Sequence, residues 1–585
     1  NIKQVELITN PGAEYGAAVG AVLKLKTVGK KIDGFGIGFR SVADYSYKIG
    51  NNDQLNVEYR QNGLDLFGTF QYRLQHLKET GETVQMTDVD TLWKQRTHST
   101  DLGKNISYFG QFGFNYEINK NHSFGATYEL TSAPCDKMSN DNRTEVYADH
   151  ELYDVWNTNA FSIEKTYPTH HSNFYYHGDI NSLEIDLNAD VLVGKNKEEE
   201  NIKELSLNYD DLYMTTFSET SNKLYAGKLV LAYPLFKGRI SGGSEYSYIH
   251  RISDFSGFGN QILGTSDKIR ERNLAFFLNC TWSLGGIDAS AGLRYEDVKS
   301  DFYENSIYQS DESKHYRNLF PSLSLKGSVG KVHWGLGYHI QVARPYYEQL
   351  KNEIHYGNRF TYLGGTPNLQ PTYIHTAEMR AAYRDLQLSV GYNRYNDDIL
   401  FSIEQATSDP KITLIKFRNV EHRDEMTASL VYSPGIGCWR PEWVASVQSQ
   451  WFNIGYLDGT KNMNGITVGI RWNNSFQLPM GYIFRLNGTY TGKGVYQNSF
   501  TRPVSCFGVS IYKSFFNGRL DCTVEGNDLF HTVRDATTQY DNKVKIYRET
   551  QRNTQEVKLT VHYKFNLQKS KYKGTGAGLD EQQRL

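Results

Sequence analysis

Apolar and polar side chains alternate with a period of two in short stretches along the whole chain. Between Leu183 and Val193 the odd positions are apolar, and most even positions carry acidic or amide side chains. The stretch from Val557 to Leu567 repeats the pattern, with Lys, Thr, His and Asn on its polar face. Because successive side chains of a strand point to opposite faces, this period predicts β-strands with one apolar and one polar face.

The polar faces carry charge along their full length, and this distinguishes a barrel from a sandwich. A packed protein interior does not tolerate a line of charged side chains. A water-filled barrel lumen does, when the apolar face of the same strands meets lipid. We therefore expect three acidic residues of the first stretch to face a lumen: Glu184, Asp186 and Asp190.

Short and long connections alternate between the predicted strands. Short turns rich in Asn, Gly and Asp occur at 119–122, 236–239, 285–286, 330–331, 384–385, 479–481 and 517–518. Long polar connections are expected near 76–105, 132–172, 194–221, 252–269, 298–316, 344–373, 402–411 and 531–553. This alternation is typical of outer-membrane barrels, with tight periplasmic turns and large extracellular loops. The fold class predicted is an all-β, transmembrane, antiparallel barrel of about 22 strands within residues 30–567.

Composition supports the same interpretation. Of the 585 residues, 14% are aromatic, and Tyr (42) far outnumbers Trp (8), as strands and membrane-interface girdles favour. Mean hydropathy is -0.57, and no apolar run approaches the ~20 residues of a spanning helix. A chain that spans a membrane without such helices does so as a closed barrel.

Charge and chemistry exclude other classes. The 63 basic and 65 acidic residues give a net charge of -2, which argues against nucleic acid as a partner. The five cysteines form no metal-ligand spacing, and no Ser/His/Asp set is marked by spacing, so we predict no enzyme, catalytic residue, cofactor or metal. His170, His171 and His177 are interpreted as a solvated surface. The glycines at 574, 576 and 578 precede no predicted helix, so residues 568–585 are expected to form a flexible periplasmic tail.

The N-terminal residues resemble a known family. The segment from Ile2 to Gly16, with Gly20 to Thr27 after it, resembles the end of the plug domain of TonB-dependent outer-membrane receptors. The signature positions are Asn10, Pro11, Ala13, Tyr15 and Gly16. The resemblance implies that residues 1–29 are the C-terminal remnant of a plug, and we expect the chain to be a fragment of a longer receptor.

Further segments resemble the same family. Residues 343–350 and 362–371 resemble a loop of its barrel, with Thr366 where the family usually has Asn. The signature residues of this loop are Arg344, Pro345, Tyr346, Leu350, Gly365, Pro367, Leu369 and Pro371. Residues 513–518 and 527–530 resemble segments near the last strands, and 572–578 an extension after the final strand in one branch.

The resemblance implies a receptor in the outer membrane that imports a bulky nutrient, such as a siderophore, haem, glycan or peptide. Its expected partners are outer-membrane lipid, the extracellular nutrient, a surface lipoprotein that presents it, and TonB through the N-terminal region absent from this sequence. Two alternatives stay open: a passive channel or structural barrel, and a surface-binding protein that acts through its loops. Substrate identity has no readable code in the loops.

Overall fold

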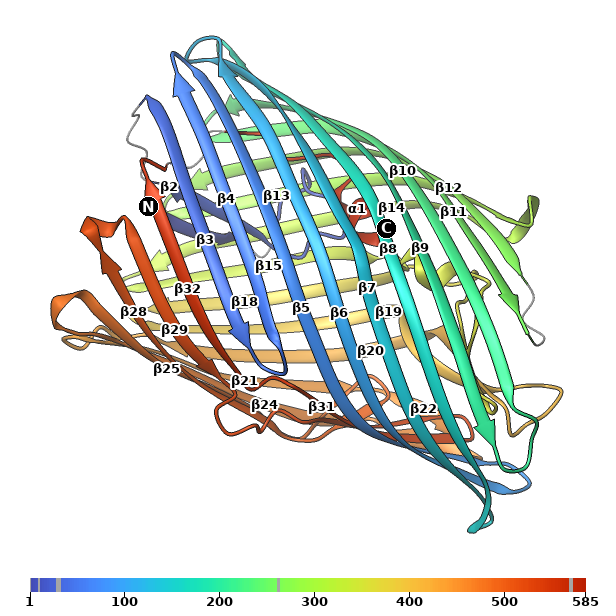
Figure 1. Cartoon of the computed structure of the whole chain (residues 1–585). Helices are drawn as coiled ribbons and strands as arrows, with labels where there is room; N and C mark the ends of the chain where they lie inside the picture. The colour runs from blue at the N-terminus through green and yellow to red at the C-terminus, as the bar shows by residue number, and fades with distance from the viewer. Residues whose placement is uncertain (1, 9–10, 28–32, 260–263, 568–571) are drawn as a thin grey trace.

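Antiparallel hydrogen bonding joins each long strand to the next around the molecule, until the last strand meets the first (Figure 1). The computed structural model describes residues 2–8, 11–27, 33–259, 264–567 and 572–585. Within those residues, 22 strands close into one barrel. Closure leaves no strand edge unpaired, which is the condition for a sheet in lipid. The predicted fold class is confirmed.

The elements fall into three groups. The barrel strands are β3 (Gly34–Tyr45), β4 (Ile49–Gln61), β5 (Leu64–Asp88), β6 (Leu92–Glu117), β7 (His122–Ala148), β8 (Glu151–Ile180), β9 (Leu183–Ser206), β10 (Leu212–Leu235), β11 (Gly238–Phe258), β12 (Thr265–Leu284), β13 (Ile287–Glu304), β14 (Ile307–Val329), β15 (Val332–Ala343), β18 (Thr372–Tyr383), β19 (Leu386–Gln405), β20 (Thr413–Tyr432), β21 (Trp439–Trp451), β24 (Gly465–Gln477), β25 (Tyr482–Thr491), β28 (Val504–Phe515), β29 (Leu520–Asn527) and β32 (Glu556–Phe565). Short strands outside this ring are β1 (Ile2–Ile8), β2 (Val22–Thr27), β16 (Ile354–Asn358), β17 (Thr361–Gly364), β22 (Asn453–Tyr456), β23 (Gly459–Asn462), β26 (Gly494–Tyr496), β27 (Ser499–Thr501), β30 (Asp535–Asp541) and β31 (Val544–Arg552). Helical turns are η1 (Tyr347–Leu350), η2 (Pro479–Gly481), η3 (Phe516–Gly518) and α1 (Leu579–Arg584).

The two ends of the barrel differ. At one end the strands are joined by short turns, such as 181–182, 236–237 and 285–286. At the other end several hairpins run far beyond the thickness of a membrane. Strand β8 has 30 residues, about 100 Å of extended chain, whereas about 9–11 residues cross a bilayer.

The long hairpins correct the position of four expected loops. Segments 76–105, 132–172, 194–221 and 298–316 are expected from the sequence to be polar connections, but most of their residues pair within β5–β6, β7–β8, β9–β10 and β13–β14. Beyond the lipid both faces of a strand meet water, so the alternation that reveals a strand is lost while its backbone pairing continues.

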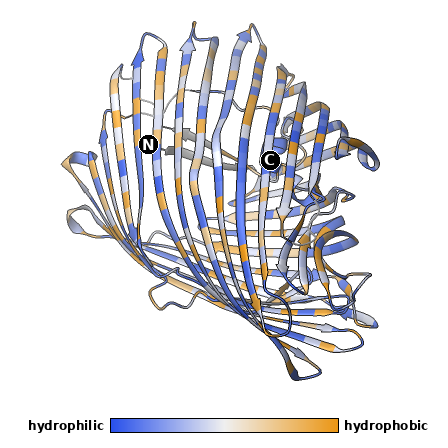
Figure 2. Ribbon diagram, turned by 45° about the vertical axis from the view of Figure 1, so that its right-hand side comes forward, coloured by the Kyte–Doolittle hydropathy of each residue, from blue (hydrophilic) through white to orange (hydrophobic). Residues whose placement is uncertain are grey.

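The two faces of each barrel strand have opposite character in the membrane-spanning part. On β9, Leu187, Val191 and Val193 are exposed, whereas Asn188 and Asp190 are only 3% and 2% exposed. Figure 2 shows this alternation as bands of hydrophobic and hydrophilic residues along the strands. The apolar side chains therefore line the outside of the barrel, and the polar ones point inward.

Short hairpins form a second tier at the end with the long connections. The strands β30 and β31 pair with each other, and β31 extends the sheet beside β5. The hairpin β16–β17 lies parallel to β20, through Tyr362 opposite Leu414. These hairpins narrow the mouth of the barrel. Among the described residues, no helix has the length and apolar character needed to cross a membrane.

Candidate functional site: a charged constriction inside the barrel

A network of buried charges lies on the inner wall of β11 and β13. Arg294 donates from Nε to Glu296 Oε1 at 2.5 Å and from its terminal nitrogen to Glu245 Oε2 at 2.9 Å. The side chains of Arg294 and Glu296 are 3% and 1% exposed. Because the two residues are two positions apart on one strand, they share a face. A buried carboxylate at this depth needs charged partners, and Glu296 finds two.

Arg344, predicted as a signature residue of the barrel loop, is the second partner of Glu296. It follows the last residue of β15, and its neighbour Pro345 cannot donate to a ladder, so strand pairing stops there. The backbone N–H of Tyr346 donates to Gln349 Oε1 at 2.9 Å, and its ring is exposed. The guanidinium of Arg344 is thus committed to the barrel wall and anchors the loop.

The rest of this loop folds back into the barrel. Leu350 packs beside the buried ring of Tyr347 in an apolar cluster on the inner wall. A Cβ atom on Gly365 would lie 2.3 Å from the carbonyl oxygen of Lys351, so a side chain has no room there. Leu369 is 3% exposed. Three predicted positions, Pro367, Leu369 and Pro371, line one small cavity together with Arg344.

Thr366, which departs from the family pattern, is held by two hydrogen bonds. Its backbone N–H donates to the carbonyl of Gln349 at 2.6 Å, and its Oγ1 donates to the carbonyl of Phe417 at 2.7 Å. The hydroxyl therefore fixes this part of the loop against β20.

The residues that resemble a plug end lie inside the barrel against the same wall. Asn10 lies outside the described residues. Pro11, Ala13, Tyr15 and Gly16 line a narrow space beside Arg294. Ala13 is 6% exposed, and a Cβ atom on Gly292 would lie 3.0 Å from its methyl carbon. The carbonyl of Ala17 accepts a hydrogen bond from the backbone N–H of Val342 at 3.1 Å.

The C-terminal segment, residues 572–585, enters the lumen and differs from the flexible tail expected for 568–585. The backbone N–H groups of Thr575, Ala577 and Gly578 donate to Asn188 Oδ1, Asp190 Oδ2 and Glu245 Oε1, at 2.9, 2.7 and 2.9 Å. The physical reason is that a lumen lined with acceptors binds an extended, glycine-rich segment through its exposed N–H groups. Figure 1 shows α1 inside the barrel.

The short helix α1 completes the network. Arg584 donates to both carboxylate oxygens of Glu271 on β12, one of them at 3.2 Å, and from Nε to the carbonyl of Pro345 at 3.0 Å. The C-terminal segment therefore ties the barrel wall to the loop that begins at Arg344.

Two acidic residues of α1 contact the plug-like segment and the wall. A Cβ atom on Gly16 would collide with the carboxylate of Asp580, so any side chain at position 16 would displace Asp580. Glu581 Oε1 accepts a hydrogen bond from Asn273 Nδ2 at 2.9 Å. Burial, with the charge of Asp580 beside it, raises the pKa of Glu581 to about 7. Three segments far apart in the sequence thus meet at one constriction.

The acidic residues predicted to face the lumen differ in their surroundings. Asp190 is the most buried, and it lies 2.8 Å from His171 Nε2 while it accepts from Ala577. Asp186 lies 2.6 Å from His177 Nδ1, and Glu184 accepts from Arg239 at 2.8 Å. In the described part of the chain, His177, Glu184 and Asp186 are close enough to hold a metal ion. The ion pair of Glu184 with Arg239 competes with that role.

Sequence reasoning missed an aromatic cluster at the mouth. Phe360, at the tip of β16–β17, makes edge contacts with Trp93 at 5.3 Å and Trp156 at 5.0 Å between ring centroids. Beside it Arg359 Nε pairs with the buried Glu204 at 2.7 Å. Because these residues come from β6, β8, β9 and a distant loop, no local spacing reveals them.

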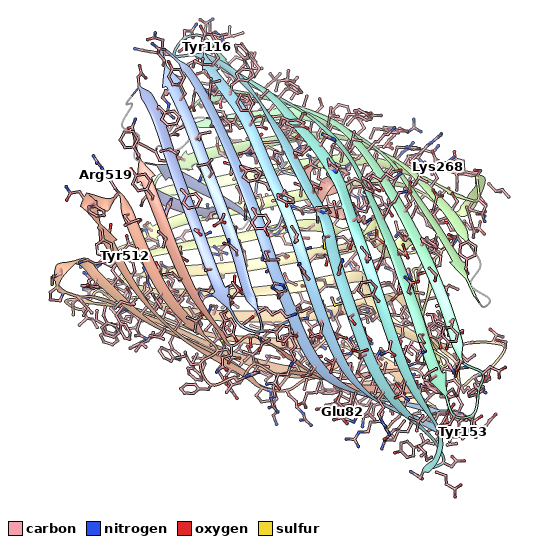
Figure 3. All side chains as sticks on the ribbon, viewed as in Figure 1. Glu82, Tyr116, Tyr153, Lys268, Tyr512 and Arg519 are labelled. Carbon is pink, nitrogen blue, oxygen red and sulfur yellow. The ribbon has the colours of Figure 1, made fainter. Side chains whose placement is uncertain are left out.

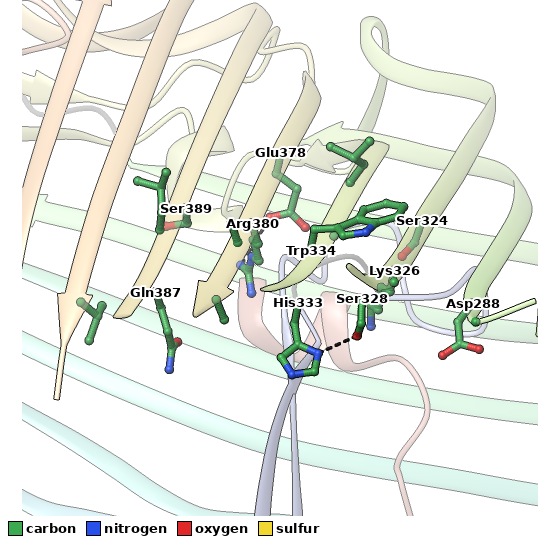
Figure 4. A pocket seen from close by; sticks show the side chains of 18 residues that line it. Asp288, Ser324, Lys326, Ser328, His333, Trp334, Glu378, Arg380, Gln387 and Ser389 are labelled. Atoms are coloured by element: carbon green, nitrogen blue, oxygen red, sulfur yellow. Dashed lines mark hydrogen bonds and ion pairs between the residues drawn. The ribbon is translucent and has the colours of Figure 1, made fainter. Parts of the chain in front are cut away.

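A polar hollow lies on the inner wall toward the short-turn end, beneath the constriction (Figure 4). It is lined by side chains of β13, β14, β15, β18 and β19. The polar members are Asp288, Ser324, Lys326, Ser328, His333, Glu378, Arg380, Gln387 and Ser389. Ser328 Oγ and His333 Nδ1 lie 2.7 Å apart, and Arg380 pairs with Glu378 at 3.4 Å.

Residues 178–563 match the outer membrane protein beta-barrel family, and the chain belongs to that family. No curated protein matches the sequence. The siderophore receptor PirA from Pseudomonas aeruginosa has a similar structure, with 13% identity, 96% of this chain and 87% of that chain covered, and a TM-score of 0.54. The FrpB iron transporter from Neisseria meningitidis shows 12% identity, with 96% of this chain and 87% of that chain covered, and a TM-score of 0.58. The copper transporter OprC shows 11% identity, with 95% of this chain and 84% of that chain covered, and a TM-score of 0.60.

At these identities the structural likeness establishes the fold. The family match confirms that the chain is an outer-membrane β-barrel protein, and with it the outer-membrane location. The similar structures are named as receptors and transporters, not as enzymes.

Proposed function

We propose that this chain is the barrel of a plug-gated receptor that imports a bulky nutrient across the outer membrane. The observation that carries the proposal is the seating of residues 11–19 inside the lumen, against the inner wall of a wide barrel. Those residues resemble the end of a plug, and the nutrient receptors among the similar structures have the same fold.

The proposed mechanism is gated passage without covalent chemistry. The nutrient would be captured at the mouth, where Phe360 and Trp93 lie, and would pass the constriction when an energised TonB moves the plug. The polar hollow beside Lys326 and Arg380 would receive the body of the plug. Glu184, Asp186 and Asp190 would line the path. The siderophore, iron and copper for which the similar structures are named favour a chelated metal as cargo, whereas haem, glycan and peptide are also compatible with the barrel.

The test compares ion conductance of this 585-residue chain with that of the same chain preceded by a plug domain, each folded into planar bilayers. We expect steady openings from the shorter protein and a closed barrel from the longer one. Equal openings from both would favour a passive channel. Silence from both, in barrels whose folding is checked by heat-modifiable electrophoresis, would favour a surface-binding protein.

The control keeps the constriction and alters only the wall facing lipid. Leu278→Val changes an exposed aliphatic side chain of β12 and leaves the lumen untouched. Its conductance should equal that of the unmodified chain in both lengths of the protein.

A further inference from the structure

Five cations gather on the outer surface of the barrel, and we call them the outer basic patch: Lys223, Lys268, Arg270, Arg272 and Lys299. On β12, Arg270 and Arg272 are exposed, and the intervening Glu271 is buried and points inward. Farther along the same outward face, Phe276 is 52% exposed and Leu278 51% exposed. The patch thus lies on the face of the wall that meets lipid. In Figure 3, Lys268 projects away from the barrel.

The patch begins immediately beyond the apolar band. The eleven residues from Leu274 to Leu284 lead to the short turn and match the about 9–11 residues that cross a bilayer. Arg272 is the next outward residue toward the end with the long connections. In register with it on β11 is Tyr248, a ring of the kind that marks the headgroup level. The cations therefore face the headgroups of the outer leaflet.

Strand register holds the cations close together. Arg272 lies opposite Lys299 on β13, and Arg270 lies opposite His250, which in turn lies opposite Lys223 on β10. Neighbouring strands are about 4.8 Å apart, so the patch spans about 15 Å from β10 to β13. That is the scale of a lipid headgroup that carries more than one phosphate.

Protein carboxylates neutralise little of this charge. Within the described residues, Lys223, Lys268, Arg270 and Arg272 form no ion pair. The ammonium of Lys268 lies 4.2 Å from the ring centroid of Tyr303. Lys299 pairs with Asp301 at 3.2 Å, and Asp301 is the acidic residue in register with Arg270.

Two other outward cations of the same wall are paired. Lys197 contacts Glu219 at 2.5 Å, and Arg317 contacts Asp297 at 3.0 Å. On another part of the wall, Arg394 lies opposite Asp424. Like charges a few ångströms apart repel one another, more strongly at a lipid interface than in bulk water. The excess of positive charge in the outer basic patch therefore suits an anionic ligand from outside the chain.

We propose that the outer basic patch binds the phosphorylated headgroup of a glycolipid in the outer leaflet of the outer membrane. The two arginines present planar forks that suit phosphate oxygens, and the lysines add point charges around them. The ring of Tyr248 borders the site at headgroup level, and the apolar band below it accommodates acyl chains. The lipid would thereby be held against β10–β13, beside the wall that carries the constriction.

The experiment measures lipid retained by the folded full chain in detergent, by native mass spectrometry, during titration with bisphosphorylated lipid A. Dephosphorylated lipid A and free pyrophosphate are titrated in parallel. We expect saturable binding of the phosphorylated lipid alone, and binding weaker on the order of 10- to 30-fold for the Arg270→Gln/Arg272→Gln double variant. The matched control is Arg394→Gln, which should bind as the unmodified chain does.

Three results would overturn the proposal. The first is that the double variant retains as much phosphorylated lipid A as the unmodified chain. The second is that dephosphorylated lipid A binds as tightly as the phosphorylated lipid. The third is that free pyrophosphate binds as tightly as the phosphorylated lipid, which would define a site for free anions. Heat-modifiable electrophoresis checks folding of each variant. Lys223→Gln/Lys268→Gln is the second variant, which removes one charge from β10 and a further charge from β12, and it should weaken binding similarly. Because the readout is lipid and not transport, it is independent of the proposed function.

Discussion

The inner and outer faces of β10–β13 use the same strands for opposite electrostatics. Inside, Arg294 is buried between Glu296 and Glu245, so its charge is neutralised by the chain itself. Outside, Arg270 and Arg272 are exposed and form no ion pair within the described residues. A buried cation has to be paired for the wall to be stable, whereas an exposed cation at a lipid interface is free to bind an external anion. The difference separates charges that hold the structure from charges available for binding.

The largest expected effect comes from two adjacent residues of β13 that point to opposite faces. Glu296→Gln leaves the buried Arg294 and Arg344 without their shared carboxylate and should cost about 3–5 kcal/mol of unfolding free energy. Asp297→Asn removes only exposed contacts with Arg317 and His315, which solvent screens, and should cost far less. Urea unfolding of the folded barrel measures both. Similar costs at the two positions would contradict the distinction between the faces.

A second pair of variants tests the faces of β9. Leu187→Arg places a charge in lipid and should impair assembly by about 2–4 kcal/mol if the residue lies near the midplane. Asn188→Arg should assemble, because it points into the lumen, but it should release the C-terminal segment that Asn188 binds through Thr575. Assembly is read from heat-modifiable electrophoresis, and release from hydrogen exchange of residues 572–585. An assembly defect at 188 as large as that at 187 would overturn the assignment of faces.

The C-terminal segment should respond to pH through Glu581. Its pKa is about 7 when docked, because of burial and Asp580, and near 4.5 in a released segment. Docking therefore favours the protonated carboxyl, and this stabilisation is complete below pH 4.5 and lost as the pH rises to 7. Hydrogen exchange of residues 572–585 should show docking about 1–2 kcal/mol weaker at pH 8 than at pH 5.5. Because burial also raises the pKa of Asp580, Glu581→Gln should weaken the dependence, and persistence of the same slope in that variant would assign it to another group.

The smallest effect is expected from an outer cation in the absence of lipid. Arg272→Gln in pure detergent should change the unfolding free energy by less than about 0.5 kcal/mol, because the side chain is exposed and unpaired in the described residues. Urea unfolding without and with added lipid A tests this value. A large loss without lipid would mean that Arg272 has a structural role like that of Arg294.

Most of the fold could be read from local patterns. Leu187 and Asn188 already have opposite characters in the sequence, and the period of two assigns them to opposite faces. The turn at Asn517 was also readable, because its φ of 54° lies in the region that Asn and Gly favour. The outward face of β12 follows the same rule. The period of two failed to predict the strands beyond the membrane, where segment 76–105 continues as paired strand without alternating apolar and polar residues.

The candidate site was only partly readable. Resemblance pointed to Arg344 and Gly16 but not to their partners, Glu296 and Asp580, which lie far away in the sequence. The aromatic cluster around Phe360 carries no local signal for the same reason. Its members become neighbours only when a distant loop folds onto the wall.

The amino-acid pattern alone establishes strands, faces, turns and a membrane barrel, because each depends on residues one to four positions apart. The folded molecule adds what depends on closure. Closing the ring brings Arg294, Arg344 and Arg584 together around Glu296 and Glu271, and draws the C-terminal segment into a lumen lined with hydrogen-bond acceptors. It also aligns cations from β10, β12 and β13 on one outer surface. Such contacts are set by the register of paired strands, and no window of sequence contains that information.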